Sequence, residues 1–159
     1  MNDLKKLFEI ADRETSAGHP KAAIQAYQRI LEQSGLNSKA QHLAHWGIGD
    51  IHLNNKQYDK AEAHLKKAVE LKPDEPIYHY LLGCTYRYIN NVEGALHHLR
   101  KAVDLEPGRE QFWGELGWVV GFNLTCRTAA LKDRLGKAST VKRTACPSRM
   151  LATSASAKL

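Results

Sequence analysis

Residues 79–107 read HYLLGCTYRYINNVEGALHHLRKAVDLEP, and residues 45–73 read HWGIGDIHLNNKQYDKAEAHLKKAVELKP. The two stretches share residue types at a constant 34-residue spacing, called here the repeat period. The matched pairs are Gly49 and Gly83, Ala61 and Ala95, Leu65 and Leu99, Ala68 and Ala102, and Pro73 and Pro107. A fixed period of this length is typical of helical hairpins that stack on one another and bury a shared core. We therefore predict an all-α fold.

The residue types at the matched positions explain why such hairpins pack. Glycine and alanine let two helices approach closely, and leucine fills the space between them. Proline at the end of each stretch cannot continue a helix, so it marks the turn to the next repeat. Within each hairpin we place the turn at Asn54-Asn55 and at Asn90-Asn91, because asparagine tolerates left-handed backbone angles.

This pattern resembles the tetratricopeptide repeat. The positions that this family fills with large or aromatic residues hold His45, Ile48 and His52 in one unit and His79, Leu82 and Tyr86 in the next. The resemblance implies a right-handed superhelical solenoid of antiparallel helical hairpins. It also implies that the first helix of every hairpin lines a concave groove in which a partner binds.

The predicted helical repeat domain spans residues 4–137. Two complete units cover 42–75 and 76–109. A degenerate unit at 4–37 precedes them, separated by a four-residue insertion from Ser38 to Gln41. A partial unit, 110–137, continues the spacing with Gly117. Terminal repeats are often atypical, because one of their faces meets water.

The repeat pattern fails beyond Phe122. Residues 138–159 are rich in Ser, Thr, Ala and basic residues, and we predict a disordered tail there. The helix expected from Glu110 to Phe122 is apolar around most of its circumference, so it needs cover on more than one face. Two explanations stay open: the segment Thr128–Lys137 folds back as a second helix, or the chain is a truncated or frame-altered form of a longer repeat protein. On either explanation the C-terminal edge is a candidate surface for self-association.

Candidate partner-binding residues follow from the groove positions of the resembled family. The predicted groove residues are Trp46, Asp50, Leu53, Asn54, Tyr80, Cys84, Arg87, Tyr88 and Trp118. Aromatic residues and arginine often anchor protein interfaces. Tyrosine and tryptophan at helical spacing are also common in cores, and Cys84 also suits a small core position, so each assignment has a packing alternative.

The predicted ligand is a protein or peptide segment with apolar anchors. Some members of the resembled family hold the C-terminus of a chaperone with a clamp of Lys, Asn and Arg. The corresponding positions here carry Phe8, Asp12, Trp46, Asp50, Tyr80 and Cys84. Asp50 would repel a carboxylate, so we expect no such clamp. The predicted function is a non-catalytic protein-interaction module that serves as an adaptor or assembly scaffold.

Sequence motifs for catalysis or metal binding are missing. No phosphate-binding glycine loop, G-x-S-x-G or H-E-x-x-H motif occurs, so we predict no enzyme and no cofactor. A metal site needs three or four converging ligands, and His45 and His52 are expected to pack inside a hairpin instead. Cys84, Cys126 and Cys146 are odd in number and widely spaced, which favours a reducing compartment.

The net charge of +6 belongs to the C-terminal part of the chain. Residues 127–159 hold eight Lys and Arg and one acid, which leaves 15 basic and 16 acidic residues in residues 1–126. The repeats are therefore not expected to bind nucleic acid. A nucleic-acid-associated protein that uses the basic tail is the alternative function.

The sequence contains no apolar run long enough for a membrane helix, and its first residues do not form a secretory signal. We predict a cytoplasmic location. The last three residues, Ala157-Lys158-Leu159, are similar to a peroxisomal import tripeptide, which leaves a peroxisomal location as the alternative.

Overall fold

The computed structural model describes the backbone of residues 2–33 and 37–134, and the side chains of residues 3–33 and 37–123. These residues form seven helices and no strand. The helices are α1 (Asn2–Ser16), α2 (Pro20–Leu31), α3 (Ser38–Asn54), α4 (Tyr58–Leu71), α5 (Pro76–Tyr88), α6 (Val92–Leu105) and α7 (Glu110–Arg134). The chain divides into two compact units, Met1–Val120 and Gly121–Leu159. The predicted tail at 138–159 lies outside the described residues.

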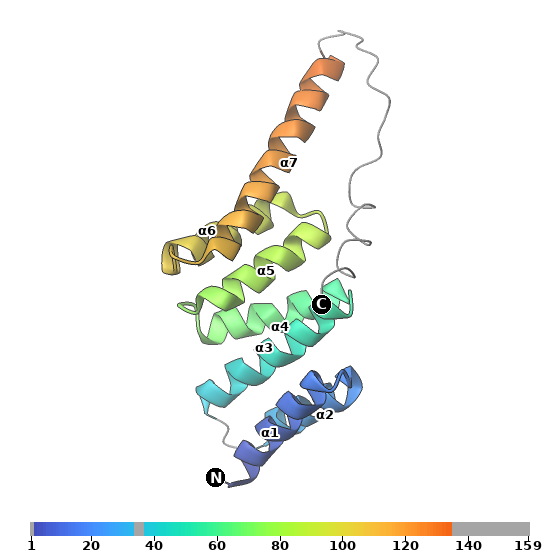
Figure 1. Cartoon of the computed structure of the whole chain (residues 1–159), viewed down its shortest axis with the longest axis vertical. Coiled ribbons are helices and arrows are strands. Elements are labelled where there is room, and N and C mark those ends of the chain that lie inside the picture. The colour runs from blue at the N-terminus through green and yellow to red at the C-terminus, as the bar shows by residue number, and fades with distance from the viewer. Residues whose placement is uncertain (1, 34–36, 135–159) are drawn as a thin grey trace. The chain divides into compact units, whose positions relative to one another are not determined.

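The first unit is built from helical hairpins that follow one another along the chain (Figure 1). Helix α1 packs against α2, α3 against α4, and α5 against α6. Neighbouring hairpins are joined by contacts of α2 with α3 and of α4 with α5. This sequential packing confirms the predicted all-α solenoid, because each hairpin contacts its neighbours in the chain.

Glycine and leucine meet where the two helices of a hairpin cross. A Cβ atom added at Gly49 of α3 would lie 2.7 Å from Cγ of Leu65 in α4. A Cβ atom added at Gly83 of α5 would lie 2.7 Å from Cγ of Leu99 in α6. Both leucines are fully buried. The same contact is thus made twice, one repeat period apart. Because glycine has no side chain, the leucine can pack directly against the facing helix.

The turn inside each hairpin has the same backbone geometry. Its left-handed residue is Gly18 (φ 74°), Lys56 (φ 60°) and Asn90 (φ 63°) in the three hairpins. The amide of the next residue donates back to a carbonyl five residues earlier: His19 to Glu14, Gln57 to His52, and Asn91 to Tyr86. This bond is part of a Schellman motif, which ends a helix with one residue in the left-handed region.

The turn prediction is therefore right at Asn90, while at Asn54-Asn55 it locates the turn but not the residue with left-handed angles. Asn54 is the last residue of α3, and Asn55 has a φ of −85°. The left-handed residue is Lys56, which lies one repeat period before Asn90. The helix end determines this position through its closing hydrogen bond, whichever residue type occupies it.

Replacing Lys56 with glycine is expected to stabilise the protein. A side chain in the left-handed region costs about 1–2 kcal/mol relative to glycine, partly offset by the greater freedom of glycine in the unfolded chain. We expect the free energy of unfolding of Lys56→Gly to rise by up to about 1 kcal/mol, measured by urea denaturation. Asn90→Gly is the matched control and should gain less, because asparagine tolerates this conformation. An equal or larger gain for Asn90→Gly would contradict the argument.

The four residues predicted as an insertion, Ser38 to Gln41, form the first turn of α3. The side chain of Asn37 caps this turn by accepting a hydrogen bond from the amide of Ala40 at 2.8 Å. The first and second hairpins are consequently offset by four residues more than the second and third, as the positions of Gly18, Lys56 and Asn90 show. The insertion lengthens a helix and does not add a loop.

Helix α7 does not turn where the preceding first helices turn. Its backbone is helical without a break from Glu110 to Arg134. The alternative in which Thr128–Lys137 folds back as a second helix is therefore wrong for the described part, because residues up to Arg134 continue α7. Phe112 is fully buried against Ala102 and Val103 of α6, and Val119 is buried with Leu82 of α5. The N-terminal half of α7 thus packs as the first helix of a fourth hairpin.

Candidate functional site

The candidate site is the surface formed by the predicted groove residues on α3, α5 and the start of α7, called here the first-helix surface. Helix α3 carries four of these residues, α5 carries four and α7 carries Trp118. Two of them, Tyr88 and Trp118, are among the few large apolar side chains with substantial exposure, at 46% and 39%. The others are mostly half-buried, so much of this surface also supports the packing of the hairpins.

Arg87 lies at the centre of an aromatic cluster on this surface, the Arg87 cluster: Tyr58, Arg87, Tyr88, Glu115 and Trp118. The Cζ atom of Arg87 lies 4.2 Å from the ring centre of Tyr88 and 4.9 Å from that of Trp118. Its Nε lies 3.0 Å from Oε2 of Glu115, and only 10% of its side chain is exposed. Cation–π contacts and an ion pair therefore hold the guanidinium between two aromatic rings.

Tyr58 extends the Arg87 cluster on the side away from α7. Its ring is stacked on Tyr88 with a centroid separation of 4.9 Å and an angle of 9°. Tyr58 is the first residue of α4, directly after the hairpin turn, while Tyr88 is the last residue of α5. Two neighbouring hairpins and α7 thus contribute to one row of flat side chains. Each ring is oriented by its neighbour before any partner arrives, which lowers the entropy cost of binding.

Trp46 is half-buried between α3 and α5. Its ring stacks on Tyr78 at a centroid distance of 6.2 Å, and Tyr78 is itself buried with its hydroxyl 2.7 Å from Nδ1 of His42. The indole Nε1–H of Trp46 is buried without a hydrogen-bond partner among the described residues. Burial lowers the pKa of His42 and raises that of Tyr78 to about 12, which keeps this contact neutral.

Tyr80 and Cys84 belong more to the packing between α5 and α7 than to an exposed groove. The ring of Tyr80 is half-buried and stacks on the buried ring of Phe112 at 4.9 Å. Cys84 is only 6% exposed, and burial raises the pKa of its thiol to about 12. The prediction that Cys84 faces a partner is therefore corrected: its side chain lies beneath the surface, and at neutral pH it is not a reactive thiolate.

The predicted groove residues at the C-terminal end of α3 are Asp50, Leu53 and Asn54, and two of these are polar. Asn54 is exposed, and its Nδ2 lies 3.4 Å from Oδ2 of Asp50. Burial raises the pKa of Asp50. When Asp50 is ionised, its charge is poorly solvated, and a second anion placed next to it would be repelled.

Four of the histidines form two pairs, each inside one hairpin. Nδ1 of His45 lies 3.1 Å from Nδ1 of His64, and Nδ1 of His79 lies 3.0 Å from Nδ1 of His98. Nδ1 of His52 lies 2.8 Å from Oε1 of Gln57, as expected for a packed ring. Among the side chains of residues 3–33 and 37–123, no group of three or more potential ligands is placed to hold a metal ion. The absence of a metal and of a cofactor stays a prediction for the whole chain.

Sequence reasoning missed two members of the Arg87 cluster. Tyr58 lies on a second helix, outside the groove positions, and its counterpart one repeat period later is Val92, so no repeated signal marks it. Glu115 contacts Arg87 from α7, and the whole of α6 lies between these two residues in the chain. Contacts of this kind depend on how the hairpins stack, which a period alone does not specify.

No helix in the described part of the chain combines the length and the apolar character needed to cross a membrane. The predictions of cytoplasmic or peroxisomal location rest on the sequence alone.

Comparison with known proteins assigns the repeats to one family. Two tetratricopeptide repeat family models match the chain, one at residues 8–76 and one at residues 76–109. The first match includes most of the unit that we predict to be degenerate, and the matches together span well over half of the sequence. No curated protein matches the chain significantly.

Solved structures with the same fold include three that are similar over most of this chain. The Thermobaculum terrenum O-GlcNAc transferase K341M mutant is 28% identical, with a TM-score of 0.66, over 76% of this chain and 22% of that protein. The MamA RS-1 ArsTM double mutant is 26% identical, with a TM-score of 0.68, over 82% of this chain and 71% of its own. The first TPR domain of Spaghetti (RPAP3), bound to an HSP90 peptide, is 17% identical, with a TM-score of 0.69, over 76% of this chain and 94% of its own.

The chain spans about a fifth of the length of the transferase, so that likeness concerns the repeats and not the whole enzyme. The family matches, the repeat period and the stacked hairpins all agree. This chain belongs to the tetratricopeptide repeat family.

Proposed function

We propose that this protein is a non-catalytic interaction module that binds a segment of a partner protein on its first-helix surface. The observation that carries the proposal is the Arg87 cluster, in which Tyr88 and Trp118 remain exposed while the residues between them are held in place. Exposed aromatic side chains on a rigid support are the residues that most often dominate the binding energy of protein interfaces.

The chemistry of the surface favours a partner segment with apolar anchors. Arg87 is already paired with Glu115, so its charge is largely neutralised and does not provide a free site for a carboxylate. Asp50, the other charged groove residue, is an acid. A repeat domain of RPAP3 binds an HSP90 peptide, which supports a peptide ligand for this fold, but the residues of this chain do not favour an acidic C-terminus.

The same arrangement supports our further proposal that the protein serves as an adaptor or scaffold. A module of this kind places two proteins side by side without changing either one chemically. The likeness to the O-GlcNAc transferase does not carry over an activity, because it covers only 22% of that enzyme. The absence of enzymatic activity remains a prediction.

The proposal predicts that a Tyr88→Ala, Trp118→Ala double variant loses partner binding. Peptides selected from a random peptide library on the wild-type protein should carry aromatic or branched aliphatic anchors. Their affinity for the double variant should fall at least about tenfold, measured by fluorescence anisotropy, because interface anchors of this type contribute about 2 kcal/mol or more.

Ile10→Ala is the matched control for this experiment. Ile10 lies on α1 and is 39% exposed, as Trp118 is, but it belongs neither to the Arg87 cluster nor to α7. Its loss should leave the selected peptides bound. Equal loss of binding in both variants, or none in the double variant, would refute the first-helix surface as the site. Binding that persists from about 50 to 200 mM salt excludes the basic tail as the source of affinity.

A further inference from the structure

In the second and third hairpins the second helix makes the same contact with the first. Leu65 lies on Gly49 and Leu99 lies on Gly83, with 2.7 Å between the leucine Cγ and an added glycine Cβ. Each leucine follows a histidine whose ring contacts a histidine of the first helix. Each is also flanked by buried alanines, which are Ala61 and Ala68 in α4 and Ala95 and Ala102 in α6. The second helix therefore presents the pattern Ala, three residues, Leu, two residues, Ala.

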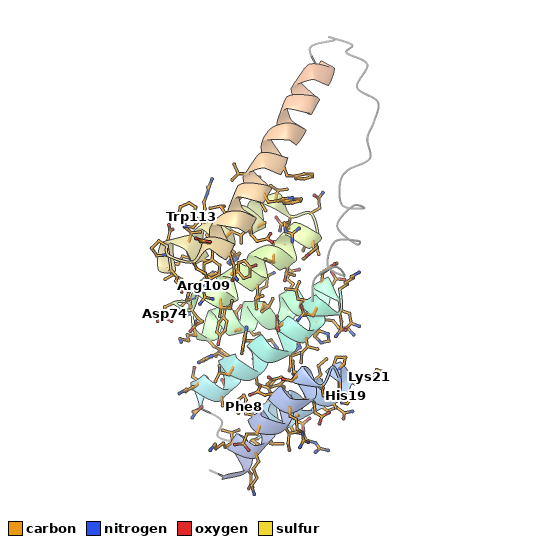
Figure 2. All side chains as sticks on the ribbon, viewed as in Figure 1. Phe8, His19, Lys21, Asp74, Arg109 and Trp113 are labelled. Atoms are coloured by element: carbon orange, nitrogen blue, oxygen red, sulfur yellow. The ribbon has the colours of Figure 1, made fainter. Side chains whose placement is uncertain are left out.

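Helix α7 repeats the first-helix half of this contact. Gly117 follows Gly83 by one repeat period, and Trp113 follows His79 by the same interval. The correspondence extends to a hydrogen bond. Nε2–H of His79 donates to the carbonyl of Pro73 at 2.9 Å, and Nε1–H of Trp113 donates to the carbonyl of Pro107 at 2.9 Å. Trp113, near the start of α7 (Figure 2), therefore corresponds to His79 near the start of α5.

In α4 and α6 the second helix supplies a leucine and a histidine to this contact. No corresponding residues contact α7 within the part of the chain whose side chains are described. Gly83 is buried, whereas Gly117 is exposed, and no described atom lies within 4 Å of a Cβ added at Gly117. His79 is 5% exposed, whereas Trp113 is 53% exposed. The glycine that would receive a leucine and the ring that would be covered are both open to solvent.

We propose that this face of α7 docks one amphipathic helix of a partner protein, which completes a fourth hairpin. We call this face, formed by Trp113, Gly117 and Val120, the Gly117 face. The docking helix places a leucine on Gly117, with a small residue four positions before it and another three positions after it. The residue before the leucine covers the ring of Trp113, as His98 covers His79.

The occupant is assigned by continuity with the two hairpins that precede it. Helices α4 and α6 are already engaged in their own hairpins, so a second copy of the chain has neither of them free. The chain's own continuation does not supply a leucine in register either. Asp133 stands one repeat period after Leu99, Gly136 stands one repeat period after Ala102, and residues up to Arg134 continue α7 itself. A helix from another protein, with the pattern of α4 and α6, satisfies both requirements.

The Gly117 face is separate from the first-helix surface. On α7, Glu115 and Trp118 contact Arg87 of α5, while Trp113 and Gly117 correspond to the residues of α5 that contact α6. A partner segment on the first-helix surface and a partner helix on the Gly117 face would therefore occupy different faces of the same helix. The two proposals stand or fall independently.

The probe for the test is a peptide with the sequence of residues 91–106, which contains α6. The change His97→Lys allows a side-chain lactam from Glu93 to position 97, on residues that are exposed in α6, and this link keeps the short peptide helical. Binding of the labelled peptide to the full chain is measured by fluorescence anisotropy. The proposal predicts saturable binding that weakens at least tenfold when Leu99 of the peptide is replaced by alanine.

Variants of the protein locate the contact. Gly117→Leu should abolish peptide binding, because the added side chain fills the place of the peptide's leucine. It should leave the fold intact, since nothing described lies within 4 Å of that position. Gln111→Leu adds the same side chain to an exposed position of α7 and should bind the peptide as the wild type does. Circular dichroism and thermal unfolding of both variants establish that they are folded.

Three results would overturn the proposal. The first is failure of the full chain to bind the linked peptide, which would mean that the face is covered by the chain's own residues or does not accept a helix. The second is equal binding by Gly117→Leu and the wild type. The third is a concentration-dependent dimer, seen by sedimentation, that Gly117→Leu disrupts and the peptide does not, which would assign the face to a second copy.

Discussion

Acidification from pH 7 to pH 4 is expected to destabilise this protein through its two histidine pairs. Burial, with the neighbouring histidine as a smaller cause, lowers the pKa of His64 and of His98 from 6.5 to about 4. In each pair the two Nδ1 atoms are 3.0–3.1 Å apart, so one ring must donate and the other must accept. When both rings of a pair are protonated, both Nδ1 atoms carry a proton, so two donors face each other.

The direction of the effect follows from the lowered pKa values. The unfolded chain binds more protons than the folded chain between pH 6.5 and about 4, so the free energy of unfolding falls as the pH falls through that range. One pKa unit corresponds to about 1.4 kcal/mol, and these rings are partly exposed, so we discount the shifts to about 1–2 kcal/mol for each pair. The two pairs together should contribute about 2–4 kcal/mol.

Urea denaturation at pH 7 and pH 4 measures this loss. A His64→Phe, His98→Phe double variant keeps two flat rings but removes their titration, so its stability should depend less on pH. His97→Phe is the control, because His97 is exposed and lies beside the second pair. The prediction fails if the double variant loses as much stability on acidification as the wild type, since carboxyl groups would then account for the whole effect.

Two glycine-to-alanine substitutions are expected to have opposite effects on stability. A Cβ at Gly47 would lie 2.5, 2.7 and 2.9 Å from three ring atoms of Tyr27. That ring cannot move aside easily, because it is 5% exposed and its hydroxyl donates to Asp12 at 3.0 Å. Overpacking of a core costs about 1–3 kcal/mol, while alanine gains about 1 kcal/mol over glycine in a helix. Gly47→Ala should therefore lower the free energy of unfolding by up to about 2 kcal/mol.

Gly117→Ala has the same gain in helix propensity and no packing cost. Nothing described lies within 4 Å of an added Cβ at Gly117, so the substitution should raise the free energy of unfolding by up to about 1 kcal/mol. The two variants should thus differ by the packing cost alone, about 1–3 kcal/mol in urea denaturation. A destabilised Gly117→Ala would mean that another part of the chain packs on this glycine.

Much of the fold could be predicted from the sequence because its contacts recur. Glycine, alanine and leucine that recur at the repeat period correspond to one helix crossing that is built twice. The left-handed residue of the turn after Asn54 was predicted wrongly, because residue preference is weaker than the hydrogen bond that closes the helix and makes Lys56 left-handed. The unbroken course of α7 was also missed, since a failing pattern does not say what replaces it.

The candidate site was predictable only in part. The exposed rings of Tyr88 and Trp118 lie at positions that the family resemblance marks, and the structure brings both onto Arg87. Cys84 occupies such a position too, but it is buried, because burial depends on what the next hairpin covers. Tyr58 joins the cluster from a second helix without any repeated signal.

The sequence by itself determined the hairpins, their order and the residues at which their helices cross. These contacts are local and periodic, so the spacing of small and large side chains is enough to specify them. Only the tertiary structure decided which aromatic side chains remain exposed, how Arg87 is held, and that Gly117 lacks the leucine that Gly49 and Gly83 receive. These features depend on contacts between residues of different hairpins, and on whether a second helix is present to make them.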